Sequence, residues 1–235
     1  METGELSTAI VIAIDGPSGS GKSSVSRGVA AALGLAYLDT GAMYRAATWW
    51  CVQRGVPLTD LDAVATEVRA LPLVMGTDPA RPTVHVGGVD VGTAIRETAI
   101  SAAVSAVATN LDVRAELGRL QRAAIDEARS GAGIVAEGRD ITTVIAPDAD
   151  VRVLLTASEE ARLARRAREL HGSADADAVE ATRDQVLRRD ADDSTVVQFH
   201  VAADGVVTVD SSHLDLDQTV QAVLDVVESV VGPRA

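Results

Sequence analysis

The stretch "AIVIAIDGPSGSGKSS" (residues 9–24) decides the fold, because it joins an aliphatic run to a glycine-rich turn. The run at residues 9–14 is rich in β-branched side chains and is typical of a strand buried on both faces of a parallel sheet. The turn at residues 16–23 fits the pattern G-x-x-x-x-G-K-[ST] at every position. Residues 23–34 then indicate a helix that ends at Gly34. The stretch therefore predicts a strand, a phosphate-binding loop and a helix.

Lys22 stands inside this turn and is the only lysine among the 21 basic residues of the chain. Glycines let successive backbone N–H groups point at phosphate oxygens, and the following helix adds its positive end. A compact ammonium reaches the β- and γ-phosphates, a task for which the planar guanidinium of arginine is a poorer fit. A chance glycine-rich turn is the alternative, and the strand–loop–helix context disfavours it.

We therefore predict that a nucleoside triphosphate binds at this loop. The Ser23 hydroxyl is the predicted ligand for its Mg²⁺ ion. The predicted triphosphate contacts are Gly16, Pro17, Ser18, Gly19, Ser20, Gly21, Lys22, Ser23 and Ser24.

The composition bounds the class of protein. The chain has 235 residues, 47% of them hydrophobic but only 2% aromatic, which favours one large domain with an aliphatic core. The formal net charge of −13 disfavours a nucleic-acid binder, so an anionic ligand needs a local basic pocket. The four histidines lack the spacing of zinc ligands.

Two further observations concern the compartment. Cys51 is the only cysteine, so no disulfide forms within the chain, and we predict a small buried side chain. We find neither a signal peptide nor a membrane-spanning run in the sequence. We therefore expect a soluble, cytoplasmic protein with no membrane partner.

Strand-like and helix-like segments alternate along the chain, which favours a parallel α/β sheet. Further strands are predicted at "LAYLDTG", "AGIVAEG", "ADVRVLLTA" and "DGVVTVDSS", and helices at residues 42–55, 97–130, 158–172 and 216–231. Residues 70–96 hold short β-like pieces separated by Gly, Pro and Asp, which predicts a small antiparallel insert. Residues 173–193 form a charged stretch with no assigned element.

The loop alone leaves several kinds of nucleotide protein open. A GTPase would carry N-K-x-D, which a chain with one lysine lacks, and we find no aliphatic strand ending in the Asp-Glu of motors and large ATPases. A kinase remains, and it needs a second anionic pocket. Candidates are Asp39, Thr40, Tyr44 and Arg45 in "YLDTGAMYR", and Arg139 and Asp140 in "EGRDITT", after a buried strand at the ligand-binding edge of the sheet.

Alternatives exist for both segments. Arg139 and Asp140 could form a surface ion pair at a strand end. The "DTG" triplet also occurs in aspartic proteases, but that interpretation needs a second carboxylate from another copy or a dimer, in an all-β fold.

The segments "IDGPSGSGKSS", "YLDTGAMYR", "AEGRDITTV…PDA" and "RRDADDST", in this order, resemble the bacterial cytidylate kinases over nearly the whole chain. The resemblance implies a P-loop NTPase fold, a parallel β-sheet flanked by helices. It also implies a nucleoside monophosphate kinase that uses ATP and Mg²⁺ to convert CMP or dCMP into CDP or dCDP. The implied parts are a core at 7–65 and 106–235, a β-rich monophosphate-binding insert at 66–105, and a helical lid at 158–190. We expect a monomer.

The resemblance also implies roles for individual residues. Arginine forks would grip the acceptor phosphate, Ser105 and Asp140 would contact the cytosine edge, and Asp193 would accept from ribose hydroxyls. Asp39 is a second candidate Mg²⁺ ligand. The implied substrate contacts are Thr40, Tyr44, Arg45, Ser105, Arg114, Arg139, Asp140, Arg189 and Asp193, and the implied catalytic residues are Lys22, Arg139, Arg162, Arg165 and Arg166.

Three of these arginines have a simpler interpretation. Arg162, Arg165 and Arg166 share one side of a predicted helix. They could form a solvated face paired with Glu159, Glu160 and Glu169, instead of a lid that closes over ATP.

The chain departs from the family where Val196 replaces an arginine that helps to hold the CMP phosphate. Either another arginine substitutes for it, or the grip on the acceptor is weaker. A kinase for shikimate, AMP or UMP and a P-loop switch without kinase activity are the rival interpretations. The sequence leaves open the preference between CMP and dCMP.

Overall fold

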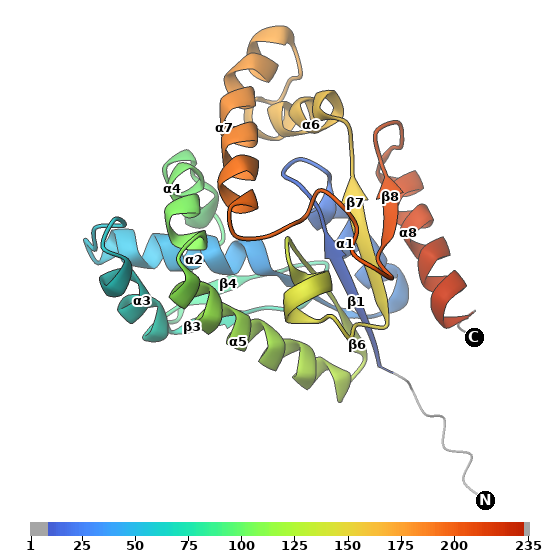
Figure 1. Cartoon of the computed structure of the whole chain (residues 1–235), viewed down its shortest axis with the longest axis horizontal. Helices are drawn as coiled ribbons and strands as arrows, with labels where there is room; N and C mark the ends of the chain where they lie inside the picture. Colours follow the sequence, from blue (N-terminus) through green and yellow to red (C-terminus); the bar gives the residue numbers. More distant parts are fainter. Residues whose placement is uncertain (1–8, 233–235) are drawn as a thin grey trace, which may run out of the picture.

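The computed structural model describes residues 9–232 and has a five-stranded sheet at its centre (Figure 1). The strands lie in the order β2-β6-β1-β7-β8, and all neighbouring pairs are parallel. They are β1 (Ile10–Asp15), β2 (Ala36–Asp39), β6 (Gly133–Gly138), β7 (Val151–Thr156) and β8 (Val207–Asp210). The predicted P-loop NTPase fold, a parallel sheet flanked by helices, is confirmed.

Both faces of the central strand β1 are covered. Ile12 and Ile14 pack in one cluster with side chains of α1 (Lys22–Leu33) and α8 (Leu216–Val231). Val11 and Ala13 pack in another cluster that includes Ile125 of α5 (Leu111–Arg129). All residues of β1 are buried, so its continuous aliphatic run matches a strand between two helical layers.

Helices α6 (Glu159–His171) and α7 (Ala176–Ser194) lie beyond the carboxyl ends of the strands (Figure 1). In open α/β sheets this edge is where ligands bind. The remaining helices, α2 (Thr40–Gln53), α3 (Leu61–Arg69) and α4 (Thr98–Ala108), pack with α5 around a third cluster of buried side chains.

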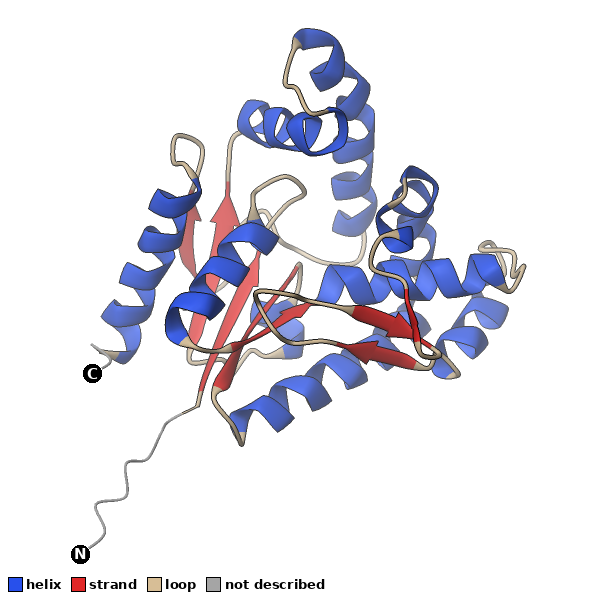
Figure 2. Ribbon diagram, turned by 180° about the vertical axis from the view of Figure 1, so that it is seen from behind, coloured by secondary structure: helices blue, strands red, loops and turns tan. Residues whose placement is uncertain are grey.

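A separate antiparallel sheet is formed by β3 (Leu73–Met75), β4 (Val84–Val86) and β5 (Val89–Asp90), and a 3₁₀ turn, η1 (Ala94–Arg96), follows it (Figure 2). The antiparallel segment predicted at 70–96 is confirmed. The backbone N–H of Tyr37 in β2 donates to the carbonyl of Thr77, between β3 and β4, at 2.8 Å. This segment therefore runs along the outer edge of the central sheet.

The division into core, insert and lid stays a prediction. Residues 7–8 and 233–235 of the predicted core lie outside the described residues.

Four helical segments differ from the prediction. The charged stretch at 173–193 is mostly α7, capped by Asp175. Its buried side includes Thr182, Val186, Asp190 and Asp193, so polar side chains hide the apolar pattern on which helix prediction depends.

The single helix predicted at 97–130 is in fact two helices, because the Asn110 side chain caps a new helix, α5. Helix α3 was not predicted, and residues between β6 and β7 form a π-helical turn, η2 (Ile141–Ile145).

Asp15, the last residue of β1, holds this π-helical turn in place. Its carboxylate accepts hydrogen bonds from the backbone N–H groups of Ile141 (3.0 Å) and Thr142 (2.8 Å), and from the Thr142 hydroxyl (2.6 Å). Burial raises the pKa of Asp15 to about 6, although these hydrogen bonds oppose the shift. A charged group at the end of the central strand thus fixes the segment that follows β6.

Replacing Asp15 with asparagine is expected to change how stability depends on pH. The folded protein binds the Asp15 proton more tightly than the unfolded chain, so this carboxyl makes the free energy of unfolding fall as pH rises from about 4 to 7. The difference in unfolding free energy between wild type and Asp15→Asn should shift by about 3 kcal/mol over that range. Urea titrations at several pH values measure it. The exposed Asp204→Asn serves as control, and a flat difference for Asp15→Asn would contradict the account.

Cys51 is fully buried in the third cluster, which α2, α3, α4 and α5 surround, as predicted, and burial raises the pKa of its thiol to about 11. Among residues 9–232, no helix is both long and apolar enough to cross a membrane.

Candidate functional site

The glycine-rich loop joins the carboxyl end of β1 to α1. Gly19 and Gly21 have φ angles of 76° and 91°, a conformation that residues with a Cβ rarely adopt. A Cβ at Gly19 would also lie 2.6 Å from the carbonyl oxygen of Arg162. The loop ends at Gly21, the N-cap of α1, so the positive end of this helix lies at the site.

A cavity of about 980 Å³ opens between this loop, α6, α7 and the β3–β4 connection. The basic side chains on its wall outnumber the acidic ones, in contrast to the net charge of the chain. The basic residues are Lys22, Arg27, Arg45, Arg96, Arg139, Arg165, Arg166, Arg168 and Arg189, and the acidic ones are Asp39, Glu137, Glu169 and Asp215. The predicted local basic pocket is therefore present.

Some of the predicted site residues line this cavity and others do not. Those on its wall are Ser18–Ser24, Asp39, Arg45, Arg139, Arg165, Arg166 and Arg189. Those that do not line it are Gly16, Pro17, Thr40, Tyr44, Ser105, Arg114, Asp140, Arg162 and Asp193.

Lys22 lies at the centre of the loop. Its ammonium donates to the carbonyl oxygen of Pro17 at 2.8 Å. Burial lowers the pKa of Lys22 to about 8, Arg139 and Arg189 lower it further, and Glu137 and Asp190 oppose the shift. An anion brought into the cavity would therefore stabilise the charged form of this side chain.

Glu137, at the carboxyl end of β6, is a site residue that the sequence reasoning missed. Its carboxylate accepts from the Ser23 hydroxyl at 2.6 Å and from the Tyr37 hydroxyl at 3.2 Å. Burial raises its pKa, nearby Asp39 adds to the shift, and Lys22 opposes it. The signal was available, because "AGIVAEG" is an aliphatic run ending in an acid, although it lacks the Asp-Glu pair.

Arg45 and Arg189 are partly buried cations with few partners, although the Nε of Arg189 lies 3.8 Å from the Asp193 carboxylate. The Nε atom of each is buried and has no hydrogen-bond partner within residues 9–232. Burial lowers the pKa of Arg189 to about 9, with Arg45 and Arg139 as the next causes. Burial also lowers the pKa of Arg45. This crowding of cations is unfavourable unless an anion enters.

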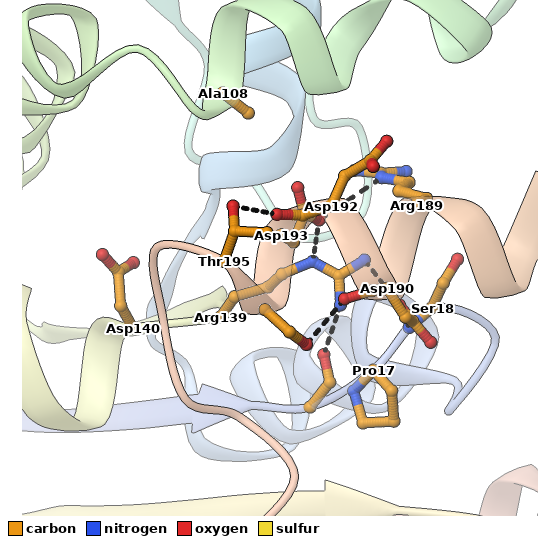
Figure 3. A network of polar contacts seen from close by, with 12 residues as sticks. Pro17, Ser18, Ala108, Arg139, Asp140, Arg189, Asp190, Asp192, Asp193 and Thr195 are labelled. Carbon is orange, nitrogen blue, oxygen red and sulfur yellow. Dashed lines mark hydrogen bonds and ion pairs between the residues drawn. The ribbon is translucent and has the colours of Figure 1, made fainter.

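Arg139 is held from several sides (Figure 3). Its Nη2 lies 3.0 Å from Asp190 and its Nε 2.5 Å from Asp193, both on α7. Its Nη1 donates to the carbonyl oxygen of Gly16 at 3.4 Å. Asp190 in turn accepts from the backbone N–H of Ser18 at 3.0 Å, so these contacts tie α7 to the phosphate-binding loop.

Asp140, one of the two residues predicted to contact the base, pairs with an arginine that was predicted to align the acceptor phosphate. Arg114 pairs with Asp140, and its guanidinium lies 5.8 Å from the centroid of the Tyr44 ring. Burial raises the pKa of Asp140, and Arg114 opposes this shift. Ser105, on α4, is only partly buried.

Two residues of the "DTG" segment serve the local structure. The Thr40 hydroxyl donates to the backbone carbonyl of Glu137 at 2.7 Å. Asp39 caps α2 by accepting from the backbone N–H of Ala42 at 2.8 Å, and its second oxygen lies 3.7 Å from Arg96.

The three arginines of α6 have different surroundings, and two of them are not a solvated face. Arg162 donates to the Ser18 carbonyl at 2.9 Å and pairs with Asp190. Arg165 donates to the Ser20 carbonyl at 3.2 Å. Only Arg166 pairs with one of the predicted acidic partners, Glu169, at 2.8 Å.

One remaining position, Val196, was named from the sequence as a departure from the family. Val196 does not line the cavity, and its backbone N–H donates to the carbonyl of Asp193 at 3.2 Å. Within the part of the chain that the structure describes, no group of three or more His, Cys, Asp or Glu side chains could hold a metal ion by itself.

Comparison with known proteins matches the chain to one family throughout. A family model described as cytidylate kinase matches residues 12–229. The chain is 50% identical to a cytidylate kinase of Streptomyces coelicolor and 49% identical to one of Streptomyces avermitilis, each over 97% of both chains. A cytidylate kinase of Cutibacterium acnes is 49% identical over 93% of this chain and 96% of its own.

Proposed function

The chain belongs to the cytidylate kinase family, and on this premise we propose that its cavity transfers the γ-phosphoryl group of ATP to CMP or dCMP. The chain is a nucleoside monophosphate kinase, a phosphotransferase with a phosphate group as acceptor. The products are ADP and CDP or dCDP. Protease and non-enzymatic switch functions are therefore discarded.

One observation of the structure carries this proposal: Arg45 and Arg189 line the cavity with buried Nε atoms that have no hydrogen-bond partner among residues 9–232, beside a lysine of lowered pKa. Two phosphate-bearing substrates would supply the missing negative charge. Lys22 and the loop N–H groups would hold the β- and γ-phosphates of ATP. Arg45, Arg139 and Arg189 would align the acceptor phosphate, which is itself the nucleophile, so we expect no essential general base.

The residues at the loop fit a Mg²⁺ ion bound together with ATP. Mg²⁺ prefers oxygen ligands and is commonly held by one or two protein groups plus phosphates and water. The Ser23 hydroxyl and the Glu137 carboxylate already meet at 2.6 Å, and Asp39 lines the same cavity. When bound, the ion would neutralise phosphate charge. Ser23 and Glu137 would hold it, with Asp39 as a further candidate.

The α6 arginines would act in two ways. Arg162 is buried behind the loop and contacts Ser18, so we propose that it positions the loop. Arg165 and Arg166 line the cavity and would face the phosphates when the lid closes. Closure of α6 and α7 would exclude water and so suppress hydrolysis of ATP.

We propose that Arg114 and Asp140 read the cytosine edge, because a buried pair shaped for one base leaves polar groups unpaired with another. Tyr44, Ser105 and Asp193 would complete the nucleoside contacts. We also propose a monomer that acts on free nucleotides in the cytoplasm.

The first experiment measures ADP release from ATP and Mg²⁺ with CMP, dCMP, UMP, AMP, GMP and shikimate, one acceptor at a time. We expect turnover that strongly favours CMP and dCMP, which would show that the acceptor site works with Val196 in place of arginine. Turnover with another acceptor would overturn the roles of Arg114 and Asp140. ATP binding without acceptor-dependent turnover would overturn the proposal.

A further inference from the structure

Phe199 is the only phenylalanine of the chain, and its side chain is 1% exposed. It belongs to none of the three clusters of buried apolar side chains that form the core. Its ring centroid lies 4.4 Å from the guanidinium carbon of Arg139. A fully buried aromatic ring is therefore packed against a functional cation.

The other contacts of Arg139 lie around the edge of its guanidinium. A guanidinium has five N–H donors. The Nη1 group donates to the Gly16 carbonyl, whereas Asp193 beside Nε and Asp190 beside Nη2 are ion-pair partners. Each terminal nitrogen carries two N–H groups and Arg139 lines the cavity, so the terminal nitrogens can also donate to the oxygens of a phosphate.

The segment that carries Phe199 joins α7 to β8 and spans residues 195–206. It is fixed near its start, where the Ser194 hydroxyl lies 3.1 Å from His200 Nε2 and donates to the Asp190 carbonyl at 2.6 Å. The His200 ring also packs against Phe199, with centroids 4.4 Å apart. Phe199 is thereby held beside the helix that supplies Asp190 and Asp193.

We infer that Phe199 is a positioning residue of the acceptor site: its ring holds the guanidinium plane of Arg139 so that two N–H groups face the acceptor phosphate. The inference rests on the proposed role of Arg139. An attraction between the ring face and the cation adds to the ion pairs, which fix only the guanidinium edge. Through Phe199, the 195–206 segment would influence how the enzyme uses its acceptor, although Val196, in the same segment, does not line the cavity.

Fluorinated phenylalanines test this inference, because a chain with one phenylalanine is labelled at position 199 alone. Fluorine weakens the attraction of the ring for a cation while the shape of the ring changes little. We expect KM for CMP to rise stepwise with the number of fluorines, by about fivefold for the most substituted ring. KM for ATP, kcat and the thermal midpoint should stay nearly constant. A KM for CMP that is flat across the series would overturn the inference.

Genetic variants provide an independent test. Phe199→Leu should raise KM for CMP and Phe199→Tyr should restore it, whereas Val201→Ala, in the same segment but 77% exposed, should have no effect. In an Arg139→Ala background, fluorination should no longer change KM, because the cation that the ring contacts is gone. An equal effect in both backgrounds would assign Phe199 to packing alone. An unmodified enzyme without CMP-dependent turnover would overturn the proposed function itself, which is a different outcome from failure of the Phe199 inference.

Discussion

Lys22→Ala is expected to lower kcat by about a thousandfold, because the ammonium is placed where charge develops on the transferring phosphoryl group. Lys22 is the only lysine, and its ammonium now contacts only the Pro17 carbonyl of the loop. The free protein should fold at least as stably as wild type, since burial holds the pKa of Lys22 at about 8 and the charged form is disfavoured there. Steady-state ADP release and thermal unfolding measure the two effects.

Lys22→Arg is the matched control, because it keeps the charge but replaces a compact ammonium with a planar fork. We expect it to recover little of the lost turnover. Full recovery would show that charge alone is sufficient. If Lys22→Ala kept more than about a tenth of wild-type kcat, Lys22 would have no direct role in transfer.

Glu137→Gln should lower kcat by about a hundredfold and raise the Mg²⁺ concentration needed for half-maximal turnover. The glutamine keeps the size of the side chain and an oxygen that can accept from Ser23 and Tyr37, but it removes the charge that would bind the cation. Burial raises the pKa of Glu137, so replacing it with a neutral group should not lower stability. Mg²⁺ titrations of ADP release at saturating ATP and CMP provide the measurement.

Glu127→Gln is the control for this substitution, since Glu127 is an exposed residue of α5, away from the cavity. An unchanged Mg²⁺ dependence in Glu137→Gln would remove Glu137 from the metal site. The Ser23 hydroxyl and the phosphates of ATP would then be the ligands of the Mg²⁺ ion.

The loop and the sheet were predictable because their causes are local. The strand, the glycines and the helix of residues 9–34 are contiguous, and each residue type has a strong preference for its conformation. Arg45, Arg139 and Arg189 were also found, since each belongs to a short motif. The lack of a hydrogen-bond partner for the Nε atoms of Arg45 and Arg189 was not predictable, because it depends on which acids the fold brings near them.

The missed residues act over long sequence separations. Asp190 reaches the backbone of Ser18, and Glu137 reaches the Ser23 hydroxyl, although neither pair is close in the chain. Phe199 gave no signal, because a lone aromatic residue in a segment without helix or strand periodicity has no pattern to mark it. Arg162, in contrast, was named from the sequence and lies on a helix that was predicted. Its burial behind the loop was not predicted, because it depends on the pairing with the distant Asp190.

The contact between Tyr37 and Thr77 has a consequence for solubility. An edge strand exposes unpaired backbone groups that can bind an extended segment of another chain. The β3–β4 connection covers the outer side of β2 at this hydrogen bond. A shortened enzyme lacking the β3–β5 hairpins would uncover that edge and self-associate, so the insert protects the sheet as well as bordering the cavity.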